Sequence, residues 1–92
     1  MKNQIAQECV NAELKSLRRL PYSELAQFVK KPQSKWVIGS DGEKYQLEVN
    51  AVWDESKPNG NLRVMVAVDD GGWRAILPLT GTFIIAPDGT LL

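Results

Sequence analysis

Four turn dipeptides divide the last two-thirds of the chain into strand-sized segments, and they constrain its fold more than any other feature. They are Asp41-Gly42, Asn59-Gly60, Asp70-Gly71 and Asp88-Gly89. Asn or Asp followed by Gly is typical of a tight hairpin turn, because these residues tolerate left-handed backbone geometry. Between the turns, apolar and polar residues alternate, as they do in a strand with one buried face. The sequence therefore predicts an up-and-down antiparallel sheet.

The alternation also predicts how the strands pair. Residues 45–53 are apolar at every odd position, and residues 62–68 are apolar at every even position. If Trp53 faces Leu62, both sets fall on one face, and a slip of one residue would move one strand's apolar set into water. A two-residue turn at Asp70-Gly71 would then pair this strand with residues 73–79. The pairs would be Val68 with Trp73, Val66 with Ala75, Val64 with Leu77, and Leu62 with Leu79.

The beginning of the chain follows a helical period instead. One apolar stripe consists of Ile5, Cys9, Val10, Leu14 and Leu17. Pro21 ends this helix and begins a second one, which Pro32 stops. We therefore predict a single α+β domain over residues 1–92. Two N-terminal helices (1–31) would pack on one face of a four- to five-stranded antiparallel meander (36–92). Residues 82–86 are apolar at both parities, so the side of this last segment that points inward stays open.

The number of cysteines and the length of the apolar runs indicate in which cellular compartment the protein resides. Cys9 is the only cysteine, so a disulfide within the chain is impossible and a reducing compartment is expected. The first residues contain no apolar core of a signal peptide, and the longest apolar runs are far too short to span a membrane. These features predict a soluble, cytoplasmic protein without a membrane partner.

The residue types present exclude the commonest catalytic arrangements. The chain has no histidine, which excludes the Ser-His-Asp and Cys-His arrangements and the usual zinc sites. Cys9 lies on an apolar stripe, where it reads as a small core residue. The residues at 69–72 suit a hairpin turn and lack the spacing of a calcium loop. Glu48, with Arg74 as its expected neighbour, leaves a carboxylate-dependent hydrolase as a third hypothesis. We therefore expect no enzyme activity, no metal and no cofactor.

The side of the sheet away from the helices is the stronger candidate for function. The predicted register gathers a small apolar patch with two arginines there, made of Met65, Ile76, Arg63, Arg74, Ala67 and Val52. Such a rimmed patch is typical of protein interfaces, although an ordinary solvated face would look similar. Trp53 and Trp73 fall on the inward side, where they would either anchor the core or line a pocket. The favoured function is a small non-catalytic binding or regulatory module that uses this face or an edge strand, with a homodimer as one option.

Charge asymmetry supports an alternative. The net charge is zero, but residues 1–35 hold seven basic against three acidic residues and residues 36–92 hold four against eight. A basic helical part could bind nucleic acid through its phosphates, at Arg18, Arg19, Lys30, Lys31 and Lys35. No exposed aromatic residue is interleaved with these side chains, as single-strand binding would require. An ordinary solvated face explains the same charges, so nucleic acid is the second candidate partner.

Overall fold

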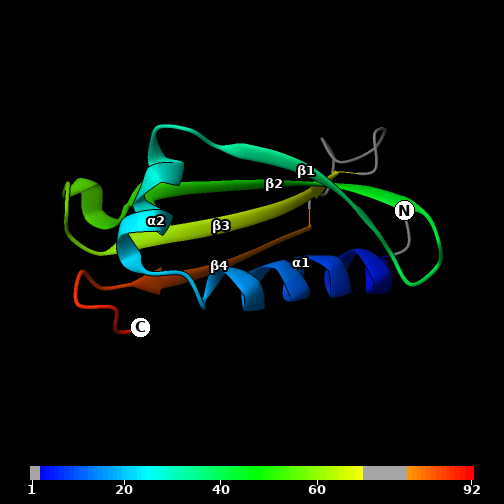
Figure 1. Ribbon diagram of the computed structural model, residues 1–92, viewed down its shortest axis with the longest axis horizontal. Helices are drawn as coiled ribbons and strands as arrows, with labels where there is room; N and C mark the ends of the chain where they lie inside the picture. Colours follow the sequence, from blue (N-terminus) through cyan, green and yellow to red (C-terminus); the bar gives the residue numbers. More distant parts are fainter. Residues whose placement is uncertain (1–2, 70–78) are drawn as a thin grey trace.

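The chain forms an α+β fold in a computed structural model that describes residues 3–69 and 79–92 (Figure 1). Its elements in chain order are α1 (Asn3–Leu17), α2 (Tyr22–Ala26), the 3-10 helix η1 (Gln27–Val29), β1 (Gln33–Ile38), β2 (Lys44–Trp53), the 3-10 helix η2 (Asp54–Ser56), β3 (Leu62–Asp69) and β4 (Leu79–Ile85). The strands form one antiparallel sheet in the order β1-β2-β3-β4. The predicted α+β class and antiparallel sheet are confirmed. A fifth strand does not occur among the described residues.

The helices form where the periodicity predicts them, with one change. On α1 the buried residues are Ala6, Val10, Leu14 and Leu17. Pro21 keeps an extended backbone (φ −69°, ψ 157°), and its carbonyl accepts hydrogen bonds from the N–H groups of Glu24 and Leu25. The predicted second helix is therefore a short α2 that continues into η1. No helix within residues 3–69 and 79–92 is long and apolar enough to cross a membrane.

β2 and β3 pair in the predicted register, with Trp53 opposite Leu62 and Val49 opposite Val66. The strand residues that this register buries are Tyr45, Leu47, Val49, Ala51, Leu62, Val64, Val66 and Val68. They share one hydrophobic core with the buried residues of α1 and with Leu25 of α2. The connection between β2 and β3 is longer than a two-residue turn. It spans residues 54–61, where Asp54 donates its N–H to the carbonyl of Asn61 at 2.8 Å.

The predicted partner of β3 on its other side is wrong. Val68 pairs with Leu79, Val66 with Gly81, Val64 with Phe83 and Leu62 with Ile85. The turn at Asp70-Gly71 and the predicted strand residues Trp73, Ala75 and Leu77 lie outside the described residues. Pro78, which the predicted register set opposite Arg63, lies outside the described residues as well. β4 has no proline and adds the buried Phe83 and Ile85 to the core.

Gly81 accounts for the close approach of α1 to β4. A Cβ atom at this position would lie 2.5 Å from Leu14 Cδ1 and 2.9 Å from Val10 Cγ1. Real Cβ atoms essentially never come so close to other atoms, so any larger residue at position 81 would force Leu14 and Val10 to move. The inward position of Gly81 also decides which side chains of residues 82–86 point into the core, a question that the sequence left open. Phe83 and Ile85 point into the core, whereas Thr82 is exposed.

Candidate functional site

The outward face of the sheet is formed by the strand residues that alternate with the buried ones. It consists of Ser34, Trp36 and Ile38 of β1, Lys44, Gln46, Glu48, Asn50 and Val52 of β2, Arg63, Met65 and Ala67 of β3, and Thr80, Thr82 and Ile84 of β4. The burial pattern of β2 shows the alternation directly, since its buried residues are separated by exposed or half-buried ones. We call this surface the outward face.

Four of the six predicted interface residues lie together on the outward face. Val52 is opposite Arg63, Met65 is opposite Asn50, and Ala67 is opposite Glu48. Arg74 and Ile76 lie outside the described residues. The places that the predicted register assigned to Arg74, Ile76 and Pro78 are taken by Thr80, Thr82 and Ile84 of β4. The face is therefore more polar beside Met65 than the sequence suggested, and it has an additional apolar residue beside Arg63.

An ion pair orients Arg63 at one end of the outward face. Its Nη2 atom lies 3.1 Å from Oδ1 of Asp54, which follows β2 directly. Both side chains keep part of their surface in water, so the pair contributes at most about 1 kcal/mol to folding. Its main effect is to hold the guanidinium beside Val52 instead of leaving it free in solution.

Two large exposed apolar residues of the outward face were missed by the sequence analysis. Trp36 is 60% exposed and Ile38 is 64% exposed, and both belong to β1. They point outward because Lys35 and Val37 take the inward positions, opposite Leu47 and Tyr45. Residues 36–38 are three apolar residues in a row, so the sequence carries no signal of which of them face outward. Apolar residues are ordinarily assigned to the buried side, and here the inward position holds a lysine.

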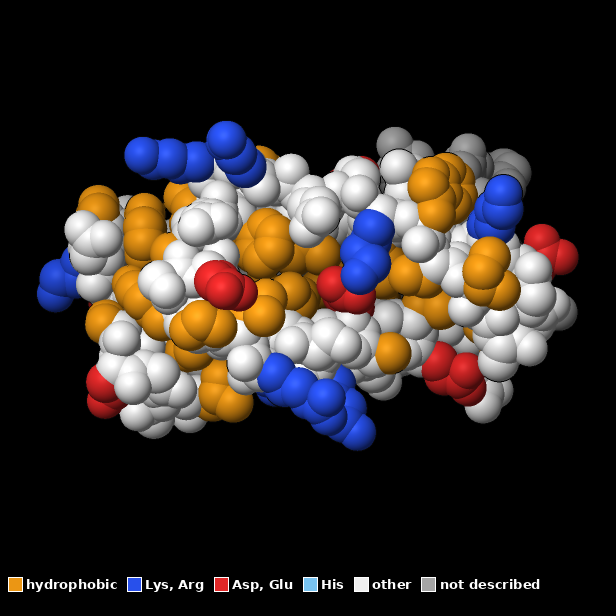
Figure 2. Space-filling view, in the orientation of Figure 1, with side chains coloured by type: hydrophobic (Ala, Val, Ile, Leu, Met, Phe, Trp, Pro, Cys, Tyr) orange, Lys and Arg blue, Asp and Glu red, His pale blue; other side chains and the backbone are white. Residues whose placement is uncertain are grey.

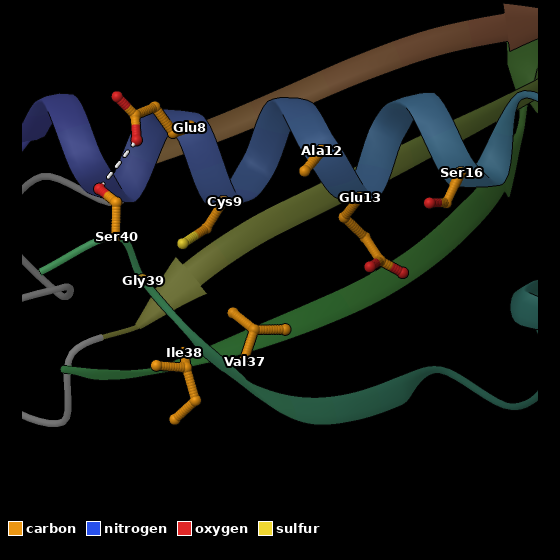
Figure 3. A pocket seen from close by; sticks show the side chains of 9 residues that line it. All are labelled: Glu8, Cys9, Ala12, Glu13, Ser16, Val37, Ile38, Gly39 and Ser40. Carbon is orange, nitrogen blue, oxygen red and sulfur yellow. Dashed lines mark hydrogen bonds between the residues drawn. The ribbon is translucent and has the colours of Figure 1, made fainter. Parts of the chain in front are cut away.

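A groove lies between α1 and the end of β1 (Figure 3). It has a volume of about 260 Å³ and is lined by Glu8, Cys9, Ala12, Glu13 and Ser16 from α1 and by residues 37–40. Two polar contacts cross it. Lys35 Nζ lies 3.0 Å from Oε1 of Glu13, and Ser40 Oγ donates a hydrogen bond to Oε1 of Glu8 at 3.2 Å. The groove is therefore acidic along its helical wall, with one lysine reaching over from β1.

Cys9 points into this groove from α1 (Figure 3). Burial raises the pKa of its thiol above the ordinary value, and the nearby carboxylates of Asp41 and Glu8 raise it further. A thiol with a raised pKa stays protonated at neutral pH and is a poor nucleophile. The surroundings of Cys9 thus favour the neutral thiol, and they set the carboxylates of Asp41 and Glu8 near it.

Tyr45 and Asp41 form the best-defined polar contact near the groove. The Tyr45 hydroxyl donates a hydrogen bond to Oδ2 of Asp41 at 2.8 Å, and Oδ1 of Asp41 accepts the N–H of Glu43 at 3.0 Å. The hydrogen bond to Asp41 raises the pKa of Tyr45 to about 12, and burial adds to the effect. The contact joins β2 to the loop that follows β1 and so fixes the end of the groove.

This contact predicts a loss of stability at alkaline pH. Tyr45 has a higher pKa in the folded chain than its ordinary value of 10.0, so its stabilising effect is complete below pH 10 and disappears as the pH rises towards 12. We expect the urea midpoint of the wild type to fall more steeply over this range than that of Tyr45→Phe, which cannot ionise there. Parallel curves for the two proteins would contradict the assignment.

The five predicted anion-binding residues come from three segments of the chain: the end of α1, the end of η1 and β1. Arg18 lies over the ring of Phe83, with Cζ 5.3 Å from the ring centroid, and Lys35 is on β1, paired with Glu13. Arg19, Lys30 and Lys31 are exposed. Figure 2 shows the Lys and Arg side chains of one side of the molecule in separate groups. On the face drawn in Figure 2 these groups do not join into the continuous basic track that phosphate binding would favour, and nucleic-acid binding stays a prediction.

The predicted carboxylate site is likewise sparse. Glu48 is exposed on the outward face between Ser34 and Ala67. Its suggested partner, Arg74, lies outside the described residues. Within the described ranges, no group of three or more His, Cys, Asp or Glu side chains is arranged to hold a metal ion. Glu48 therefore has the surroundings of an ordinary solvated residue.

Tyr22 and Trp53 pack together at the end of the core, with ring centroids 6.5 Å apart. Trp53 is partly buried against the core, and the Tyr22 hydroxyl donates a hydrogen bond to the carbonyl of Gly60 at 2.6 Å. Trp53 thus anchors α2 to the end of β2, while Trp73 lies outside the described residues.

Comparison with known proteins finds no matching family model and no significantly similar curated protein or solved structure.

Proposed function

We propose that this chain is a non-catalytic module that binds another protein through the outward face of its sheet. The observation that carries the proposal is the exposure of large apolar side chains there: Trp36 at 60%, Ile38 at 64% and Val52 at 43%. Tryptophan, methionine and arginine are enriched in protein interfaces, and Met65 and Arg63 lie on the same face. Bound protein would remove these apolar groups from water.

The proposal takes both helices to lie on the inward side of the sheet, which leaves the outward face open. Its support is the shared core of α1, α2 and the inward residues of β2 and β3. It assigns no catalytic role to Cys9, in keeping with the raised pKa of the thiol. A reducing, cytoplasmic setting follows from the single cysteine and is part of the proposal.

Met65→Glu tests the proposal at the centre of the face. A photoreactive amino acid at position 65 should crosslink a discrete protein partner in cells. The purified partner should then bind Met65→Glu at least about tenfold more weakly, the usual effect of placing a charge in a desolvated interface. Thermal melting should be nearly unchanged, because the side chain of Met65 is outside the core.

The matched control adds the same charge elsewhere. Ser23 is exposed on α2 and is not one of the outward-face residues, and Ser23→Glu should bind the partner as the wild type does. Equal binding by Met65→Glu and the wild type would contradict the proposed face. Equal loss in both variants would point to a general effect of charge and would contradict it as well.

A further inference from the structure

The two edge strands of the sheet, β4 and β1, differ in whether another described segment pairs with them. β4 is met by the C-terminal segment, where Leu92 donates its N–H to the carbonyl of Ile84 at 2.8 Å and Leu91 bridges to Ile85. β1 pairs with β2, and no other described segment pairs with it. An unpaired edge presents a row of N–H and C=O groups that can accept another strand. β1 can therefore pair with a strand from another molecule.

Its hydrogen-bond pattern identifies the residues that face outward along this edge. Gly39 donates its N–H to the carbonyl of Glu43 at 2.9 Å. In an antiparallel pair, hydrogen-bonded and non-bonded residues alternate. The residues of β1 at odd positions therefore bond to β2. Ser34, Trp36 and Ile38 direct their backbone groups away from the sheet, and their side chains belong to the outward face.

We propose that this edge joins two copies of the chain, with one β1 antiparallel to the other about a twofold axis at Trp36. In this register Trp36 faces the partner's Trp36, and Ser34 faces the partner's Ile38. These are the residues whose backbone groups point outward, so each pair exchanges two hydrogen bonds. The result is one continuous sheet across both copies.

A second copy fits better than an unrelated strand because β1 is complementary to itself. On the outward face the axis brings together two Trp36 rings and sets Ile38 beside them, which joins the most exposed large apolar residues of both strands into one patch. On the inward side, the same register sets the partner's Lys35 opposite Val37. Val37 lines the acidic groove with Glu8 and Glu13.

Charge supports this inward contact. Glu13 is already paired with Lys35 of its own chain. Glu8 accepts the hydroxyl of Ser40, and no lysine or arginine of the described residues forms an ion pair with it. The partner's Lys35 would bring a positive charge to this side of the groove. Because of the twofold axis, the same contact would form a second time, from this chain's Lys35 to the partner's groove.

This inference extends the proposed function without depending on it, and different variants test the two. In sedimentation analysis the wild type should show the mass of two chains and dissociate on dilution. Trp36→Lys should raise the dimer dissociation constant by more than about 30-fold, the effect of losing an interface tryptophan and adding an edge lysine. Ser34→Pro should do the same, since it removes an outward N–H and no bond to β2.

Amide exchange gives a readout that does not depend on either variant folding well. The N–H groups of Ser34, Trp36 and Ile38 should be protected in the concentrated wild type and should exchange rapidly after dilution. Met65→Glu should remain dimeric, which separates this interface from the proposed binding face. A wild type with the mass of one chain at every concentration would overturn the inference and leave a foreign strand as the alternative. A dimer that Trp36→Lys leaves intact would also overturn it.

Discussion

Val66→Asp is expected to unfold the protein or nearly so. Val66 has 0% exposure and lies at the centre of the sheet, between Val49 of β2 and Gly81 of β4. A carboxylate there would have no cation to pair with among the neighbouring apolar side chains. An unpaired buried charge costs about 3–5 kcal/mol, which is a large part of the stability of a domain of this size. Urea denaturation followed by circular dichroism measures the loss.

The neighbouring position provides the control. Met65→Asp places the same charge one residue earlier in β3, where the side chain points to the outward face. It should cost no more than about 1 kcal/mol, the range of strand preferences at such positions. Similar losses in Val66→Asp and Met65→Asp would mean that β3 does not separate a buried side from a solvated one.

Gly81→Val should produce the second large effect, through overpacking. A Cβ at position 81 would overlap Leu14 and Val10 of α1, so even Gly81→Ala should lower the free energy of unfolding by about 1–3 kcal/mol. Valine adds two methyl groups to the overlap and should cost more. In a strand without this contact, replacing glycine by valine would instead be stabilising. Urea midpoints of the two variants give the comparison.

A double mutant separates overlap from a change in strand preference. Leu14→Ala removes the side chain that lies nearest to the added Cβ. The cost of Gly81→Ala should therefore become smaller in the Leu14→Ala background, with a coupling of about 0.5–3 kcal/mol between the two sites. Thr82→Val, on the exposed side of the same strand, should be close to neutral. Strictly additive effects of the substitutions at positions 14 and 81 would contradict close packing of α1 on β4.

Much of the candidate site could be predicted because β2 and β3 alternate cleanly. The register that sets Trp53 opposite Leu62 also sets Val52, Arg63, Met65 and Ala67 on one face. Their proximity follows from a period of two residues and from the burial of one side. Neither condition requires knowledge of distant parts of the chain, which is why this part of the prediction is correct.

The neighbours of those residues could not be predicted in the same way. Residues 73–79 and residues 79–85 are both rich in strand-forming side chains, and the dipeptide at residues 70–71 favoured the nearer one. Residues 79–85 pair with β3 because they pack against α1, where the absence of a side chain at Gly81 leaves space for Leu14 and Val10. That fit involves residues more than sixty positions apart. A local turn signal does not contain this information.

The sequence by itself determined the α+β class, the helical beginning, the antiparallel sheet and the face to which most residues of β2 and β3 belong. Periodicity carries these properties, because it reflects which side of each element leaves water. Only the tertiary structure decided the strand that lies beside β3 and the exposed position of Trp36. Lys35 takes the inward place on β1, where its ammonium group pairs with Glu13 of α1. The local sequence does not reveal such a pairing, since it depends on where the helix packs.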